Sequence, residues 1–98
     1  MRFRSQDDEN MLVDMYRMES PDAGIGKEIG NVVRKVQLNF KGSPGSLGQR
    51  LLVDLQNPGN FIAVSYWLDK ESLANAKELH AALDKAVGRF NVKTTMTN

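Results

Sequence analysis

Residues 47–67, LGQRLLVDLQNPGNFIAVSYW, decide the fold, because two apolar runs flank a short turn sequence there. The turn is formed by residues 57–60 (NPGN). Its proline fixes one backbone φ angle, and its glycine supplies a positive φ without a steric penalty. Two apolar runs joined in this way predict a β-hairpin made of residues 47–55 and 61–67.

The register of this hairpin is predicted by matching apolar positions on its two strands. Pairing Gln56 with Phe61 gathers six side chains on one apolar face. They are Leu51, Val53, Leu55, Ile62, Val64 and Tyr66. The other face is mixed and carries Arg50, Leu52, Asp54, Ala63, Ser65 and Trp67. We therefore predict that the apolar face contacts a second subunit and that the mixed face borders a ligand pocket.

A strand and a helix are predicted on the N-terminal side of the hairpin. Residues 11–18 (MLVDMYRM) form a short apolar run that Pro21 ends, as is typical of a strand. Residues 25–40 carry apolar side chains at helical spacing, and Asp22 can cap this segment. The helical stripe consists of Ile25, Ile29, Val32, Val33, Val36 and Phe40.

A second helix and a last strand are predicted on the C-terminal side. Asp69 is a suitable N-cap for a helix over residues 70–87, which Gly88 would end. Residues 90–96 alternate between apolar and polar side chains, and this pattern is typical of a strand.

The resulting order is βαββαβ, which predicts an α+β, ferredoxin-like fold with a four-stranded antiparallel sheet. We expect a polar lead-in over residues 1–10 and one domain over residues 11–98. Right-handed crossovers place both helices on the same face of the sheet. The other face then lacks a cover, and a second copy of the chain is the simplest one, so we expect a homodimer.

Composition excludes several classes of function. The net charge of +1 argues against a nucleic-acid partner held by a basic surface. The absence of cysteine excludes disulfides and thiolate metal sites, and a single histidine, His80, excludes a metal centre with several histidines in one chain. Residues 1–10 do not resemble an export signal, and no stretch is apolar for long enough to span a membrane. We therefore expect a cytoplasmic protein without a membrane partner.

Residues 43–73, SPGSLGQRLLVDLQNPGNFIAVSYWLDKESL, resemble the central signature of the antibiotic biosynthesis monooxygenase family. The matching positions are Pro44-Gly45, Gly48, Arg50-Leu51-Leu52, Asp54, Asn57-Pro58-Gly59, Phe61 and Trp67. The resemblance implies a dimeric α+β barrel with a pocket between the sheet and the helices of each subunit. It also implies either a cofactor-independent oxygenase acting on quinols or polycyclic phenols, or a relative that binds and degrades haem.

The resemblance also suggests site residues. Trp67 matches the tryptophan that shapes the family's pocket, and His80 lies on the second helix, in the neighbourhood of the iron ligand of the haem enzymes. The family's first strand often carries an asparagine that orients oxygen or substrate. Residues 11–18 contain none, and Asn10 lies just before them.

Each candidate aromatic or histidine residue has a functional and a structural interpretation. Trp67 either lines a substrate pocket or fills the core at the end of the sheet. His80 either ligates iron or moves a proton, or it is a half-buried histidine with one hydrogen bond. Tyr16 and Tyr66 either donate to a ligand oxygen or act as core aromatics with a solvated hydroxyl.

The mixed face supplies the other candidates. Arg50 and Ser65 could bind a phenolate or carboxylate ligand, or Arg50 could form an ion pair with Asp54 or with the partner subunit. The resemblance thus implies a cofactor-independent monooxygenase for a small aromatic substrate. Its catalytic candidates are Trp67, His80 and Tyr16, and its substrate-binding candidates are Arg50, Ser65 and Tyr66.

Three other functions stay open at this point. The first is a non-catalytic dimeric barrel that binds a ligand or responds to stress, which the missing first-strand asparagine favours. The second is a haem-binding or haem-degrading relative. The third is an RNA-recognition domain, which shares the βαββαβ order; it ranks well below the others, because the basic-glycine-aromatic step before residues 60–67 is missing.

Overall fold

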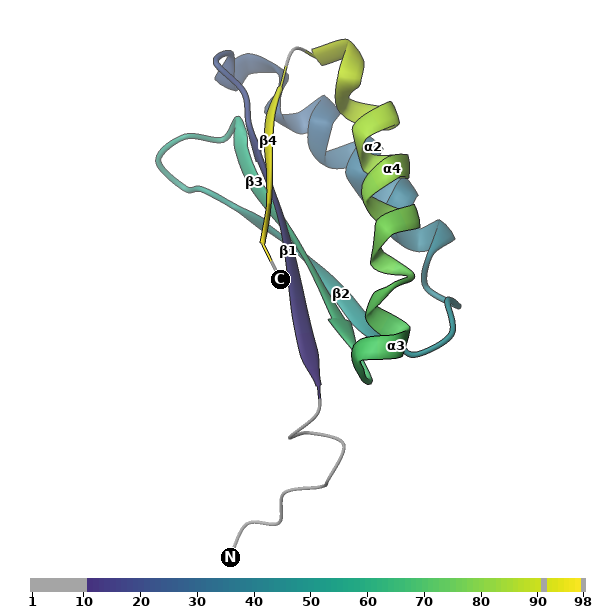
Figure 1. Ribbon diagram of the computed structural model, residues 1–98. Coiled ribbons are helices and arrows are strands. Elements are labelled where there is room, and N and C mark those ends of the chain that lie inside the picture. The colour runs from purple at the N-terminus through teal and green to yellow at the C-terminus, as the bar shows by residue number, and fades with distance from the viewer. Residues whose placement is uncertain (1–10, 91, 98) are drawn as a thin grey trace, which may run out of the picture.

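The computed structural model describes residues 11–90 and 92–97, and the predicted lead-in over residues 1–10 lies outside them. The chain forms one antiparallel sheet with its helices on one face (Figure 1). The elements are β1 (Leu12–Glu19), the 3₁₀ turn η1 (Ala23–Ile25), α2 (Gly26–Asn39), β2 (Ser46–Val53), β3 (Asn60–Trp67), α3 (Lys70–Leu73), α4 (Ala76–Val87), the 3₁₀ turn η2 (Gly88–Phe90) and β4 (Lys93–Thr97).

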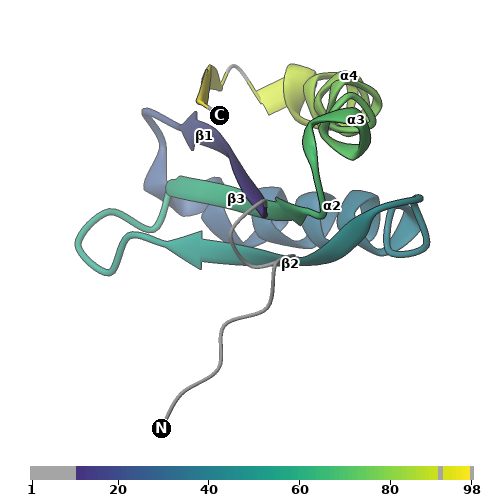
Figure 2. The same cartoon turned by 60° about the horizontal axis from the view of Figure 1, so that its bottom comes forward.

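The sheet has the order β2-β3-β1-β4, and every neighbouring pair of strands is antiparallel. Figure 2 shows α2 and α4 on the same side of the sheet. This arrangement confirms the predicted ferredoxin-like α+β fold. No helix among residues 11–90 and 92–97 combines the length and apolar character that spanning a membrane requires.

The predicted register of the hairpin is wrong. Phe61 pairs with Val53 instead of Gln56, a shift of three residues, and β2 ends at Val53, two residues before the predicted end at Leu55. The Asp54 carboxylate accepts hydrogen bonds from the backbone N–H groups of Gln56 at 2.9 Å and of Asn57 at 3.4 Å. The Asp54 N–H still donates to the carbonyl oxygen of Asn60 at 3.0 Å, and the bonds to the Asp54 carboxylate turn the chain away from β3 after this residue.

A shift by an odd number of residues moves every β2 side chain to the other face. Leu51 and Val53 therefore lie opposite Ala63 and Phe61 on the helix-covered face. Arg50 and Leu52 lie on the helix-free face, opposite Val64 and Ile62. The helix-free face is consequently less uniformly apolar than the sequence predicted.

Two other boundaries differ from the prediction. The second helix is split into α3 and α4 by residues 74–75, although Asp69 caps its start as expected and accepts from the Ser72 N–H at 2.8 Å. The last strand begins at Lys93, because Phe90 ends η2. The expected alternation from residue 90 also runs through Asn91, which lies outside the described residues.

The core lies between the sheet and the two long helices. It consists of Tyr16, Met18, Ile29, Val33, Phe61, Ala63, Trp67, Ala76, Leu79, Leu83 and Val87. On the helix-free face, Val13, Met15 and Leu52 remain 38%, 40% and 50% exposed. Apolar surface is therefore left uncovered on the face that the sequence assigned to a second subunit.

Candidate functional site

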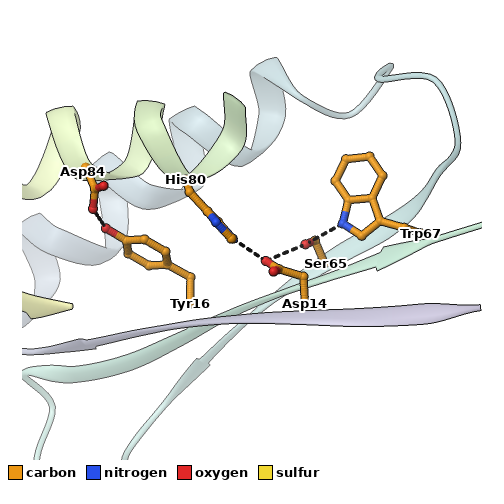
Figure 3. A network of polar contacts seen from close by, with 6 residues as sticks. All are labelled: Asp14, Tyr16, Ser65, Trp67, His80 and Asp84. Carbon is orange, nitrogen blue, oxygen red and sulfur yellow. Dashed lines mark hydrogen bonds and ion pairs between the residues drawn. The ribbon is translucent and has the colours of Figure 1, made fainter. Parts of the chain in front are cut away.

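A buried contact between a carboxylate and an imidazole joins the middle of the sheet to α4. Asp14 on β1 is 1% exposed, and its Oδ2 lies 2.5 Å from Nε2 of His80 (Figure 3). His80 belongs to the buried face of α4, with Leu79 and Leu83, so the helical period aims its ring at the sheet. A carboxylate is retained in a core only when it is hydrogen-bonded or paired, and this contact meets that requirement.

Ser65 and Trp67 on β3 extend the pair along the sheet. The register of β1 and β3 places Ser65 directly opposite Asp14. The Ser65 hydroxyl donates to Asp14 Oδ2 at 3.4 Å, and the indole Nε1–H of Trp67 donates to Ser65 Oγ at 2.9 Å. Figure 3 shows these side chains as one row from the indole to the imidazole. Trp67 is fully buried and satisfies its single donor within this row.

Tyr16 lies on the other side of the imidazole. The centroids of its ring and the His80 ring are 5.4 Å apart, and its hydroxyl donates to Asp84 Oδ1. Burial, followed by the hydrogen bond to Asp84, raises the pKa of the Tyr16 phenol well above its ordinary value. Tyr16 is therefore a neutral phenol at physiological pH, with its donor directed at Asp84.

A pocket of about 370 Å³ opens beside His80. It is lined by Lys70, Leu73, Ala74, Ala76, Lys77, His80 and Met96. Within the described residues β4 pairs with β1 only from Met15 to Glu19, so the ladder ends next to Asp14. The pocket thus lies between α3, α4 and β4, and two of its lining residues are lysines.

The structure brings four of the six predicted site residues together. Tyr16, Ser65, Trp67 and His80 form the buried network behind the pocket, and only His80 reaches the pocket itself. Arg50 and Tyr66 do not join them; they line a separate depression of about 460 Å³ with Leu47, Gly48 and Gln49.

Sequence reasoning missed three residues of this site: Asp14, Lys70 and Lys77. Asp14 had a detectable signal, because it shares the two-residue period of the buried Tyr16 and Met18 and is the one acid within residues 11–18. The two lysines had no such signal, since charged residues on a helix usually face solvent. Only their position next to His80 distinguishes them.

The Asp14–His80 pair has a defined chemical capacity. An imidazole that donates its Nε2–H to a carboxylate keeps Nδ1 as a hydrogen-bond acceptor and proton acceptor. The carboxylate fixes the orientation of the ring and stabilises the imidazolium that forms on protonation. His80 can therefore act as a base toward a molecule in the pocket.

The site fits a haem group poorly. Nε2 of His80 lies 2.5 Å from Asp14 Oδ2, so iron could bind this nitrogen only by displacing the carboxylate. The residues that the structure describes contain no cluster of three or more histidine, cysteine or acidic side chains suited to a metal ion.

Comparisons with known proteins show the type of fold. Neither a model of a protein family nor a curated protein sequence matches the chain. SnoaB, a cofactor-independent oxygenase from Streptomyces nogalater, superposes with a TM-score of 0.70 at 14% identity, covering 91% of this chain and 92% of SnoaB.

Two further solved structures agree. A candidate antibiotic biosynthesis monooxygenase from Deinococcus radiodurans has a TM-score of 0.67 at 19% identity and covers 89% of this chain and 91% of its own. A second candidate, from Nitrosomonas europaea, has a TM-score of 0.67 at 13% identity; the match covers 89% of this chain and 97% of the other. The fold of this chain is therefore that of the antibiotic biosynthesis monooxygenases, as the resemblance of residues 43–73 implied.

Proposed function

We propose that this protein is a cofactor-independent monooxygenase that oxidises a small, electron-rich phenol or quinol in the pocket beside His80. The observation that carries this proposal is the buried Asp14–His80 pair, whose imidazole is the one ionisable group from the core that reaches the pocket. The fold shared with SnoaB supports an oxygenase, and SnoaB itself is described as cofactor-independent.

The first step is removal of a proton from the substrate. The phenolic O–H gives its proton to Nδ1 of His80, and Asp14 stabilises the resulting imidazolium. Lys70 and Lys77 in the lining attract the phenolate and favour its formation, because opposite charges stabilise the ionised form. An electron-rich anion is what dioxygen needs as a partner in the absence of a metal or flavin.

The later steps conserve atoms and electrons without a further reductant. The substrate anion passes one electron to dioxygen, and the two radicals combine to a carbon–oxygen bond on a ring carbon that still bears hydrogen. The peroxide anion takes back the proton from the His80 imidazolium and becomes a hydroperoxide. Loss of water from that carbon leaves a carbonyl group. One oxygen atom enters the product, a quinone, and the other leaves in water with two hydrogens of the substrate.

The remaining network residues act through His80 as positioning residues. Ser65 donates to Asp14 and accepts from Trp67, so these two residues hold the carboxylate in place. The Tyr16 ring packs against the imidazole from the other side. Arg50 and Tyr66 lie on the helix-free face and have no part in this proposal.

Oxygen uptake tests the proposal most directly. We expect purified protein to consume oxygen with members of a panel of quinols and polycyclic phenols, and His80→Gln and Asp14→Asn to lower kcat by about 100- to 10,000-fold. Lys85→Gln is the matched control, because Lys85 is an exposed cation of α4 that does not line the pocket. Unchanged turnover in His80→Gln would refute the role of His80 as the base.

A non-catalytic ligand-binding protein is the second candidate. It is favoured by the lining of the pocket, which offers no hydroxyl or amide side chain to orient dioxygen among the residues that the structure describes. In this case the same panel would quench Trp67 fluorescence saturably, while no oxygen would be consumed. Oxygen consumption that tracks saturation would exclude this candidate.

We further propose that the protein is a cytoplasmic homodimer that pairs through its helix-free face. The exposed apolar side chains Val13, Met15 and Leu52 on this face support the pairing. Light scattering at micromolar concentration should give twice the chain mass, and Leu52→Glu should give a monomer. Leu55→Glu is the control, since Leu55 is 92% exposed in the hairpin loop and should leave the dimer intact. A monomeric mass for the unaltered protein would refute this pairing.

A further inference from the structure

A second pocket, of about 450 Å³, lies between α2 and the edge strand β2. It is lined by Arg34, Gln37, Leu38, Lys41, Ser46, Gly48 and Gln49. None of these residues lines the pocket beside His80, which lies between α3, α4 and β4. The pocket therefore has no role in the function proposed above.

Two polar atoms in this lining lack partners. Ser46 Oγ and Gln49 Oε1 are buried, and neither makes a hydrogen bond to any residue in the described part of the chain. A buried polar atom without a partner is costly and calls for an explanation, such as a bound molecule. Both of these atoms belong to one pocket, so one ligand could satisfy both.

The orientation of the Gln49 amide is settled by its neighbours. Its Nε2 donates to the carbonyl oxygen of Gln37 at 3.2 Å, and Nε2 of Gln37 donates to the carbonyl oxygen of Arg50 at 3.0 Å. Exchanging O and N of the Gln49 amide would place two acceptors against each other. Oε1 is therefore the atom without a partner, and it requires a donor from the ligand.

The charged side chains of the pocket have one sign. Arg34 and Lys41 are both cationic, and among residues 11–90 and 92–97 no acidic side chain lines the pocket. Arg34 also borders an adjoining depression of about 400 Å³ that contains Lys27 but again no acid. A planar guanidinium pairs preferentially with a carboxylate, through two parallel hydrogen bonds.

A backbone irregularity opens the floor of the pocket. The pairing of β2 with β3 is interrupted between Ser46 and Gly48, and Gly48 has a φ of +129°. A Cβ atom at Gly48 would meet no atom within 4 Å, so open space lies over this position. The exposed side chain of Leu38 adds apolar surface beside it.

From these observations we propose that the pocket between α2 and β2 binds a small amphipathic organic acid. Its carboxylate pairs with Arg34, assisted by Lys41. An N–H or O–H group on its body donates to Gln49 Oε1, and its apolar ring lies against Leu38 and Gly48. The ligand must therefore combine a negative charge, an apolar body and one donor.

Isothermal titration calorimetry with three matched probes tests each requirement. Indole-3-acetate has the carboxylate, the ring and an N–H donor; 1-naphthylacetate lacks the donor; and indole-3-acetamide lacks the charge. We expect indole-3-acetate to bind tightest and indole-3-acetamide weakest. Failure of indole-3-acetate to bind at millimolar concentration, or equal binding of all three probes, would overturn the proposal.

Variants then locate the bound probe. Arg34→Gln should weaken indole-3-acetate at least about tenfold, as expected for a lost charge-assisted bond. Gln49→Met should remove the preference for indole-3-acetate over 1-naphthylacetate. Lys35→Gln, which removes an exposed charge from α2 outside the pocket, should change nothing.

Two results would contradict this location. If Lys35→Gln weakens binding as much as Arg34→Gln does, the attraction is a general effect of charge. If His80→Gln abolishes binding while Arg34→Gln does not, the acid occupies the other pocket. Circular dichroism of each variant verifies that the fold is intact, so that a loss of binding reports on the site.

Discussion

Replacing Ser65 by alanine isolates the network behind His80. The indole of Trp67 is fully buried, Ser65 is 2% exposed, and the bond from Nε1 to Ser65 Oγ is 2.9 Å long. Without the hydroxyl the indole N–H has no acceptor in a dry environment. An orphaned buried donor costs about 1–3 kcal/mol, so Ser65→Ala should lower the free energy of unfolding by about that amount.

A double-mutant cycle with Trp67→Phe separates this cost from the others. Phenylalanine has no N–H group, so Ser65→Ala no longer orphans a donor in that background. What then remains is the loss of the longer bond from Ser65 to Asp14. We expect Ser65→Ala to be less destabilising in the Trp67→Phe protein by about 0.5–3 kcal/mol, the range of coupling between residues in contact.

Urea denaturation followed by far-ultraviolet circular dichroism suits this cycle, since the Trp67→Phe protein and the double variant both lack the single tryptophan fluorophore. The four proteins should share one slope against denaturant and differ in midpoint. Equal costs of Ser65→Ala in both backgrounds would refute the indole–hydroxyl bond. In that case Trp67 would be held by packing alone, and the network would end at Ser65.

Three further predictions concern the fold. Gly26→Ala should lower the free energy of unfolding by about 1–3 kcal/mol despite alanine's higher helix propensity, because the new Cβ would lie 2.2 Å from the carbonyl oxygen of Pro58. Gly88→Ala is the control and should leave stability unchanged, because a Cβ there meets nothing within 4 Å. Equal denaturation midpoints for the two variants would contradict this packing. Tyr16 should ionise well above pH 10 in a spectrophotometric titration, because its pKa is raised in the folded protein. Its contribution to stability is therefore complete below about pH 10 and is lost at higher pH. If the Tyr16→Phe protein gave the same titration curve, this assignment would be excluded. The hydrogen bond from the Ser72 N–H lowers the pKa of Asp69. The melting temperature of the wild type should therefore fall toward that of Asp69→Asn below about pH 4. A difference in melting temperature between the two proteins that does not change with pH would argue against the charged cap.

Part of the candidate site could be predicted from sequence. Four of its residues were named because they are a tryptophan, a histidine, a tyrosine and a serine at suggestive positions: Trp67, His80, Tyr16 and Ser65. Their mutual contacts could not be predicted, since Asp14 and His80 are 66 residues apart and meet only because α4 contributes to the same buried core as the sheet. Arg50 was grouped with Ser65 and Trp67 on the strength of a hairpin register that the structure does not have, whereas Tyr66 was named only as a possible hydrogen-bond donor.

By itself the sequence determined the kinds of element and their order. Periods of two and of 3.6 residues, the Asp69 cap and the turn at residues 57–60 act over a few positions, so neighbouring residues are enough to encode them. The tertiary structure decided the hairpin register, where the carboxylate of Asp54 ends β2 early. It also decided which face each β2 side chain occupies and where a pocket forms beside His80, between α3, α4 and β4. Both features depend on packing between elements that are far apart in the chain.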